Sequence, residues 1–117
     1  RWQKIALSAA EQSGRGRVPE VRALGSYAEA VAEAAQAELP LFFYENEKTV
    51  RLADALSGCA PRSVSLMTGP EGGFEPGEVE AAENAGLQSC SLGPRILRCE
   101  TAPLCALSAV LFALGQL

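Results

Sequence analysis

The stretch Ser63-Val64-Ser65-Leu66-Met67-Thr68-Gly69-Pro70-Glu71-Gly72-Gly73-Phe74 joins a short apolar run to a loop rich in glycine and proline. Pro76, which suits a first helical turn, begins a predicted helix that continues to Ala85 and stops at Gly86. A strand that leads through such a loop into a helix is a building unit of α/β proteins. The stretch therefore predicts an α/β fold.

Working outward, the remaining sequence continues this alternation. Helices are predicted over residues 1–12, 27–38 and 47–56 and from Thr101 onward, and strands over residues 41–44, 63–68 and 87–91. Strands that alternate with helices predict a parallel sheet with flanking helices. Three strands are few for such a sheet, so either strands are missing from this chain or the sheet is completed elsewhere.

Side-chain patterns give finer expectations for the helices. Ser26 and Thr101 are predicted N-caps. The last helix is apolar almost all round, which predicts burial in the core or against another subunit. Trp2, Ile5, Ala6 and Ala9 are expected to share one face of the first helix. Val50, Ala53 and Leu56 are expected to face inward from the third. Cys90 and Cys105 are expected to be small core residues.

Composition sets the outer limits. The chain has 117 residues, 48% hydrophobic and 21% charged, which is typical of one globular domain. It has no histidine, which excludes Ser-His-Asp and Cys-His nucleophile systems. The four cysteines have no zinc-site spacing, so no metal site is predicted, and free thiols favour a reducing cytoplasm.

Charge is unevenly distributed along the chain. Residues 1–22 carry five basic and two acidic side chains, a net +3, whereas the rest carries five basic and twelve acidic side chains, a net −7. The basic opening is either a solvated surface or a contact for phosphates. The most apolar stretch, residues 102–117, is shorter than the roughly 20 residues that span a bilayer, so no membrane partner is expected.

Three loops follow the predicted strands, at residues 45–47, 69–74 and 92–98. Ligands of open α/β sheets bind beyond the carboxyl ends of the strands. The glycine loops match neither the dinucleotide fingerprint nor the phosphate-binding loop, and simple turns are the competing interpretation. Glu71 and Glu100 can serve helix N-termini or pair with arginines, and Arg95 and Arg98 can be solvated, while Ile96-Leu97 turns inward.

Several motifs together are similar to one family. They are Arg1-Trp2-Gln3-Lys4-Ile5-Ala6, Glu11-Gln12-Ser13-Gly14-Arg15, Arg17-Val18-Pro19-Glu20, the Gly69–Phe74 loop and Leu92-Gly93-Pro94-Arg95-Ile96-Leu97-Arg98-Cys99-Glu100-Thr101-Ala102. In this order they closely resemble the ribosomal RNA small subunit methyltransferase E family, of the SPOUT class. Cys99 departs from the threonine that is usual there.

The resemblance implies a SPOUT-type fold with a C-terminal trefoil knot, and a homodimer through the knot region and the last helix. It implies S-adenosylmethionine-dependent methylation of nitrogen 3 of a uridine in small-subunit (16S) ribosomal RNA, in the cytoplasm. It also implies that residues 1–117 are the C-terminal part of the methyltransferase domain, without the N-terminal PUA-like RNA-binding domain and the first strands.

The resemblance also implies site residues. The cofactor pocket would be formed by Tyr44, Glu45, Gly69, Pro70, Glu71, Gly72, Gly73, Leu92, Gly93, Arg95, Ile96 and Leu97. Within these motifs Glu71 or Glu100 is the candidate base and Arg98 the candidate stabiliser of the uridine anion. Arg15 and Arg17 are candidate contacts to RNA phosphates.

Other functions compete with this interpretation. One is a SPOUT methyltransferase acting on another RNA, and a second is a non-catalytic RNA-binding or dimerisation module. A third is a nucleotide-binding α/β domain, which the lack of a lysine near residues 69–73 disfavours.

Overall fold

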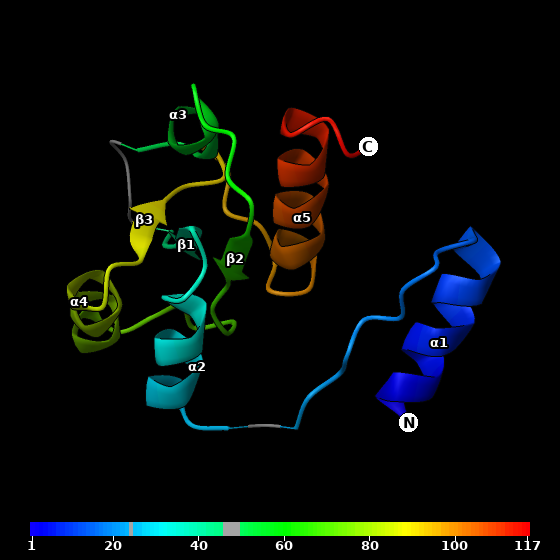
Figure 1. Cartoon of the computed structure of the whole chain (residues 1–117). Helices are drawn as coiled ribbons and strands as arrows, with labels where there is room; N and C mark the ends of the chain where they lie inside the picture. Colours follow the sequence, from blue (N-terminus) through cyan, green and yellow to red (C-terminus); the bar gives the residue numbers. More distant parts are fainter. Residues whose placement is uncertain (24, 46–49) are drawn as a thin grey trace.

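The computed structural model describes residues 1–23, 25–45 and 50–117. Its centre is a three-stranded parallel sheet in the order β2-β1-β3, formed by β1 (Leu39–Phe43), β2 (Val64–Met67) and β3 (Gln88–Cys90). Helices cover both faces of the sheet, and α1 (Trp2–Ser13) lies apart from this body (Figure 1). The predicted α/β class and parallel sheet are confirmed.

The central strand is longer at its start than the sequence predicts, because it includes Leu39 and Pro40. The backbone N–H of Leu39 donates to the carbonyl of Ser63 at 3.0 Å, on the β2 side. Since the direction of N–H groups alternates along a strand, the Pro40 nitrogen faces the β3 side, where pairing begins only at Leu41 opposite Gln88. Proline therefore removes no ladder hydrogen bond here.

Side chains of β1 alternate between two apolar cores. Leu41 and Phe43 pack with α3 (Leu52–Leu56) and α5 (Thr101–Ala113) on one face. Phe42, which is fully buried, packs with α2 (Tyr27–Ala34) and α4 (Pro76–Asn84) on the other. Both faces of β1 are thus covered by helices, which explains its unbroken apolar sequence.

The N-terminal ends of α2 and α3 differ in how well the sequence predicts them. Ser26 caps α2 as predicted, with its hydroxyl accepting from the Glu29 backbone N–H at 3.1 Å. The start of the predicted 47–56 helix falls partly on residues 46–49, outside the described residues. Where the chain is described again, Arg51 bridges to Ser91, and α3 begins only at Leu52. The predicted inward position of Ala53 is wrong, because Leu52 and Ala55 are the buried residues.

Two expectations for the last helix are also wrong. Thr101 is the first helical residue of α5, and Glu100 occupies the N-cap position without a side-chain cap. Cys105 is exposed, unlike Cys90, which is fully buried on β3. The reason is that α5 contacts the sheet along the face of Ala106 and Val110, and no described residue buries its opposite face, where Leu104 and Phe112 are exposed.

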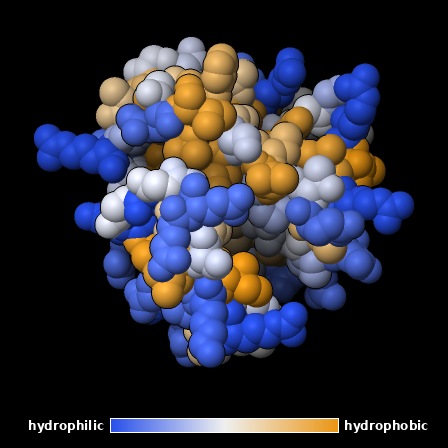
Figure 2. All heavy atoms as spheres, turned by 90° about the vertical axis from the view of Figure 1, so that its right-hand side faces the viewer, coloured by the Kyte–Doolittle hydropathy of each residue, from blue (hydrophilic) through white to orange (hydrophobic). Residues whose placement is uncertain are grey.

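The helix α1 is held to the segment after it by one side chain. The Gln3 amide donates to the Pro19 carbonyl at 2.8 Å and accepts from the Val21 N–H at 2.7 Å. The predicted apolar face of α1 is largely exposed, with Trp2 62% and Ile5 56% accessible. Figure 2, which views the molecule from the α1 side, shows exposed apolar side chains between hydrophilic ones.

Candidate cofactor site

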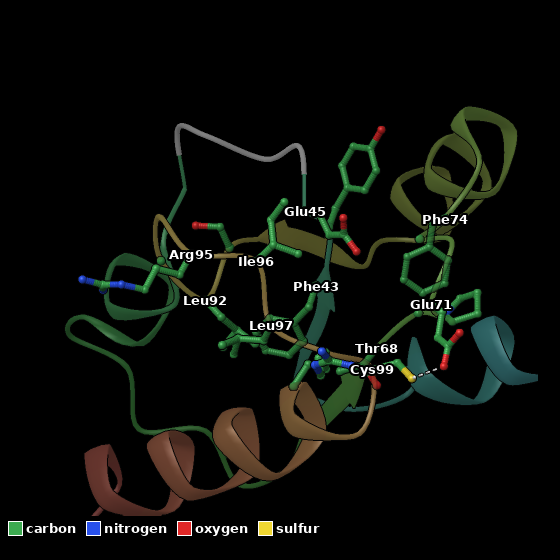
Figure 3. Close-up of a pocket in the computed structure, with 18 of the residues that line it drawn as sticks. Phe43, Glu45, Thr68, Glu71, Phe74, Leu92, Arg95, Ile96, Leu97 and Cys99 are labelled. Atoms are coloured by element: carbon green, nitrogen blue, oxygen red, sulfur yellow. Dashed lines mark hydrogen bonds between the residues drawn. The ribbon is translucent and has the colours of Figure 1, made fainter.

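A cavity of about 470 Å³ lies at the carboxyl end of the sheet. It is bordered by the ends of β1 and β3 and by the loops that follow all three strands. The two loops rich in glycine and proline, 69–74 and 92–98, share this cavity, as the sequence analysis expects (Figure 3). The volume falls in the range of about 300–1,000 Å³ that is usual for small-molecule sites.

The first loop is a tight turn followed by an aromatic anchor. The Gly73 N–H donates to the Pro70 carbonyl at 2.9 Å, and Gly73 has a φ of +74°, which glycine adopts without strain. A Cβ added to Gly73 would lie 3.6 Å from the Glu45 carboxylate, so the end of β1 lies against this turn. At its three glycines the loop has no side chain between its backbone and the cavity.

The second loop supplies the apolar wall. Leu92 and Leu97 are half-buried, and Figure 3 shows them with Ile96 toward the middle of the pocket. Leu97 turns inward as expected. Ile96, in contrast, is 76% exposed, so the expectation that it is buried is wrong. Arg95 lines the cavity, and its guanidinium group points away from the pocket centre (Figure 3).

Two carboxylates converge on the thiol of Cys99. The sulfur lies 3.3 Å from Glu100 Oε2 and 3.9 Å from Glu71 Oε1, and Figure 3 shows the contact with Glu71. The hydrogen bond to Glu100, followed by burial and the charges of both carboxylates, raises the pKa of Cys99. The thiol therefore stays protonated at neutral pH and links the first loop to the start of α5.

The predicted site residues fall into two groups. All of the candidate cofactor residues, together with Arg98 and Glu100, line the cavity. Arg15 and Arg17 are exposed on the segment after α1 and do not line it. Thr68, Ser91 and Cys99 also line the cavity and are not among the predicted site residues, although Thr68 and Ser91 each directly follow a strand.

Comparison with known proteins identifies the class of this fold and site. The family model of the RNA methyltransferase domain matches residues 1–111, and the chain belongs to this family. Among curated relatives, ribosomal RNA small subunit methyltransferase E of Bacillus subtilis is 40% identical over 115 residues, covering 94% of this chain and 45% of the relative. The chain thus spans about half the length of the curated relatives it matches.

Solved structures agree with the sequence comparison. Ribosomal RNA small subunit methyltransferase E from Neisseria gonorrhoeae, bound to S-adenosyl methionine, superposes with a TM-score of 0.79 at 39% identity, covering 96% of this chain and 46% of that one. A Legionella pneumophila protein assigned as a methyltransferase, in complex with the same cofactor, gives a TM-score of 0.84 at 37% identity, covering 96% of this chain and 45% of that one. The resemblance to this methyltransferase family is therefore confirmed.

Proposed function

We propose that this chain carries the cofactor site and catalytic residues of an S-adenosylmethionine-dependent methyltransferase of small-subunit ribosomal RNA. The observation that carries the proposal is the single cavity bordered by both glycine-proline loops. Membership of the RNA methyltransferase domain family supports it, and so do similar structures that hold S-adenosyl methionine.

The residues present fit this cofactor. Gly69–Gly73 and Leu92–Leu97 offer backbone amides and carbonyls for the adenine and ribose, with Leu92 and Leu97 as apolar walls. A Cβ added to Gly72 or Gly93 meets no protein atom within 4 Å, so space remains beside both loops. The carboxylates Glu45 and Glu71 lie at the same cavity and suit a cationic ligand. When bound, the cofactor supplies a methyl group made electrophilic by its sulfonium.

The chain's own residues have the remaining task of making uridine nitrogen 3 nucleophilic. This nitrogen carries a proton at neutral pH, and Glu71 or Glu100 would accept that proton through a carboxylate oxygen. Arg98 would stabilise the negative charge left on the uracil ring. The position of all three around one cavity supports these roles, and Cys99, between Arg98 and Glu100, lies within 3.9 Å of Glu71 Oε1.

RNA contact is proposed for Arg15 and Arg17. Both are exposed on the segment after α1, where the sequence has its net positive charge. Arg22, nearby, is instead paired with Glu33 of α2. Guanidinium groups that are exposed on a locally basic segment suit the phosphate backbone, which positions RNA without reading its sequence.

We also propose the finer features that the family implies: the C-terminal trefoil knot, a homodimer through the knot region and α5, and action in the cytoplasm. The exposed side chains of Leu104, Leu107 and Phe112 on α5 support pairing, because they form an uncovered apolar face. Four free cysteines support a reducing compartment. No helix in the part of the chain described by the structure has the length and apolarity needed to cross a membrane.

The deciding experiment has two stages. Isothermal calorimetry of the chain with S-adenosylmethionine should show saturable binding, whereas ATP should not bind; the reverse preference would refute the proposal. Transfer of a labelled methyl group to small-subunit RNA, followed by nucleoside analysis, should yield 3-methyluridine. A product methylated at another atom would refute the N3 assignment, and an Arg98→Ala variant that methylates normally would exclude Arg98 from the reaction.

A further inference from the structure

The aromatic ring of Phe74 lies at the junction of the first cofactor loop and the sheet. Its centroid is 4.2 Å from that of Phe42, the fully buried residue of the central strand. It is 6.1 Å from the ring of Tyr27, whose hydroxyl donates to the Glu78 carbonyl at 2.7 Å. Phe74 thus contacts β1 and α2 immediately before α4 begins, while remaining in the wall of the cavity.

The same ring also touches the first residue of the loop. A Cβ added to Gly69 would lie 2.9 Å from Cε2 of Phe74, closer than such atoms are found in proteins, and 3.0 Å from its Cδ2. Gly69 is not among the glycines with a positive φ. Glycine is therefore required at this position by the space that the ring occupies and not by the backbone conformation.

Both ends of the loop therefore lie at the Phe74 ring, which packs against Phe42. The loop begins at Gly69 against the ring, turns through the Pro70–Gly73 hydrogen bond, and ends at the residue that carries the ring. A segment with three glycines has much conformational freedom to lose when it is ordered. A ring that is fixed on Phe42 provides the rigid support against which this segment is held.

We propose that Phe74 is a positioning residue for the cofactor: its ring is the template that fixes the backbone groups of residues 69–73 in the cavity. The inference rests on the proposed function, because it assigns these backbone groups to S-adenosylmethionine. It predicts that Gly69 and Phe74 are coupled, so that a larger residue at 69 is tolerated once the residue at 74 is smaller.

The test is a double-mutant cycle of Gly69→Ala and Phe74→Leu, measured by calorimetry with S-adenosylmethionine and by chemical unfolding. Each single variant should bind about tenfold more weakly, because overpacking or loss of the ring displaces the loop. The double variant should bind more tightly than Gly69→Ala alone, because the leucine lacks the ring atoms that the new methyl group meets. Gly77→Ala is a matched control outside the cavity and should bind like the wild type.

The two proposals fail in different ways. A wild-type chain that does not bind S-adenosylmethionine overturns the proposed function. A wild-type chain that binds, together with a Gly69→Ala variant of equal affinity or a double variant no better than Gly69→Ala, overturns the role of Phe74. If Gly69→Ala does not fold, adding Phe74→Leu should restore folding in the double variant. Unchanged affinity of Phe74→Leu alone for S-adenosylmethionine also overturns the inference.

Discussion

Gly93 provides the most direct test of how the second loop shapes the cavity. Its φ is +119°, a value that residues with a side chain rarely adopt, and a Cβ placed there meets no atom within 4 Å. Gly93→Ala therefore introduces no collision within the protein, and its effect on the free energy of unfolding comes from the backbone. Holding a residue with a Cβ in such a conformation costs about 1–3 kcal/mol.

This cost can be expressed in two ways. If the loop keeps its shape, the free energy of unfolding falls by about 1–3 kcal/mol. If the loop relaxes instead, stability is retained and S-adenosylmethionine binds about 5- to 150-fold more weakly, because the bound shape must be restored. We expect the two losses, measured by denaturant unfolding and calorimetry, to sum to at least about 1 kcal/mol.

Gly77→Ala is the matched control. Gly77 lies in α4 outside the cavity, without a positive φ and with open space around a new Cβ. Alanine there should leave cofactor affinity unchanged and stabilise the helix by up to about 1 kcal/mol. The reasoning is refuted if Gly93→Ala matches the wild type in both measurements, or if Gly77→Ala is as damaging.

Three further predictions follow from the same structure. Gly72→Val should abolish S-adenosylmethionine binding in calorimetry while the unfolding curve stays unchanged, because its Cβ meets no protein atom within 4 Å; normal affinity would exclude close approach of the cofactor at Gly72. The thiol of Cys99 should react with iodoacetamide more slowly than those of Cys59 and Cys105 at neutral pH, because its pKa is raised. Its hydrogen bond to Glu100 is retained below that raised pKa and lost as the pH passes above it. Glu100→Gln should lower this pKa and speed the reaction, and an unchanged rate would show that Glu100 is not its main cause. Tyr27→Phe should lower the free energy of unfolding by about 1 kcal/mol through loss of the hydrogen bond to Glu78, with a zero effect arguing against that bond in solution.

The sequence predicts most of the elements because local signals and packing agree. Ser26 caps α2, Pro76 begins α4, and the apolar runs become strands. The predictions are wrong at positions where a contact with a residue distant in the sequence determines the local structure. Arg51 leaves the predicted helix to pair with Ser91, forty residues away in the chain and invisible to local periodicity. Hydrophobicity alone likewise does not show which face of α5 meets the sheet, so Cys105 was predicted to be buried when it is exposed.

The sequence predicts the location of the cavity better than it predicts the contacts among the residues that line it. Parallel strands end at the same edge of the sheet, so loops 69–74 and 92–98 are expected at one edge, while the order β2-β1-β3, with one strand between them, is set by the fold. The contact between Gly69 and the Phe74 ring could not be predicted, because the glycine loop looks like a turn that needs conformational freedom. The convergence of Glu71 and Glu100 on Cys99 also depends on the folded path of both loops.

The arrangement of the strands also affects the order of events during synthesis. The cavity draws on residues from Phe43 to Ala102, and its third loop follows β3, the last in sequence of the three strands in the described residues. On a ribosome, an incomplete chain that ends before β3 has the first two loops but not the wall that faces them. Capture of a small molecule is therefore expected to come late, after β3 has joined β1, and to report that the loop after β3 is in place.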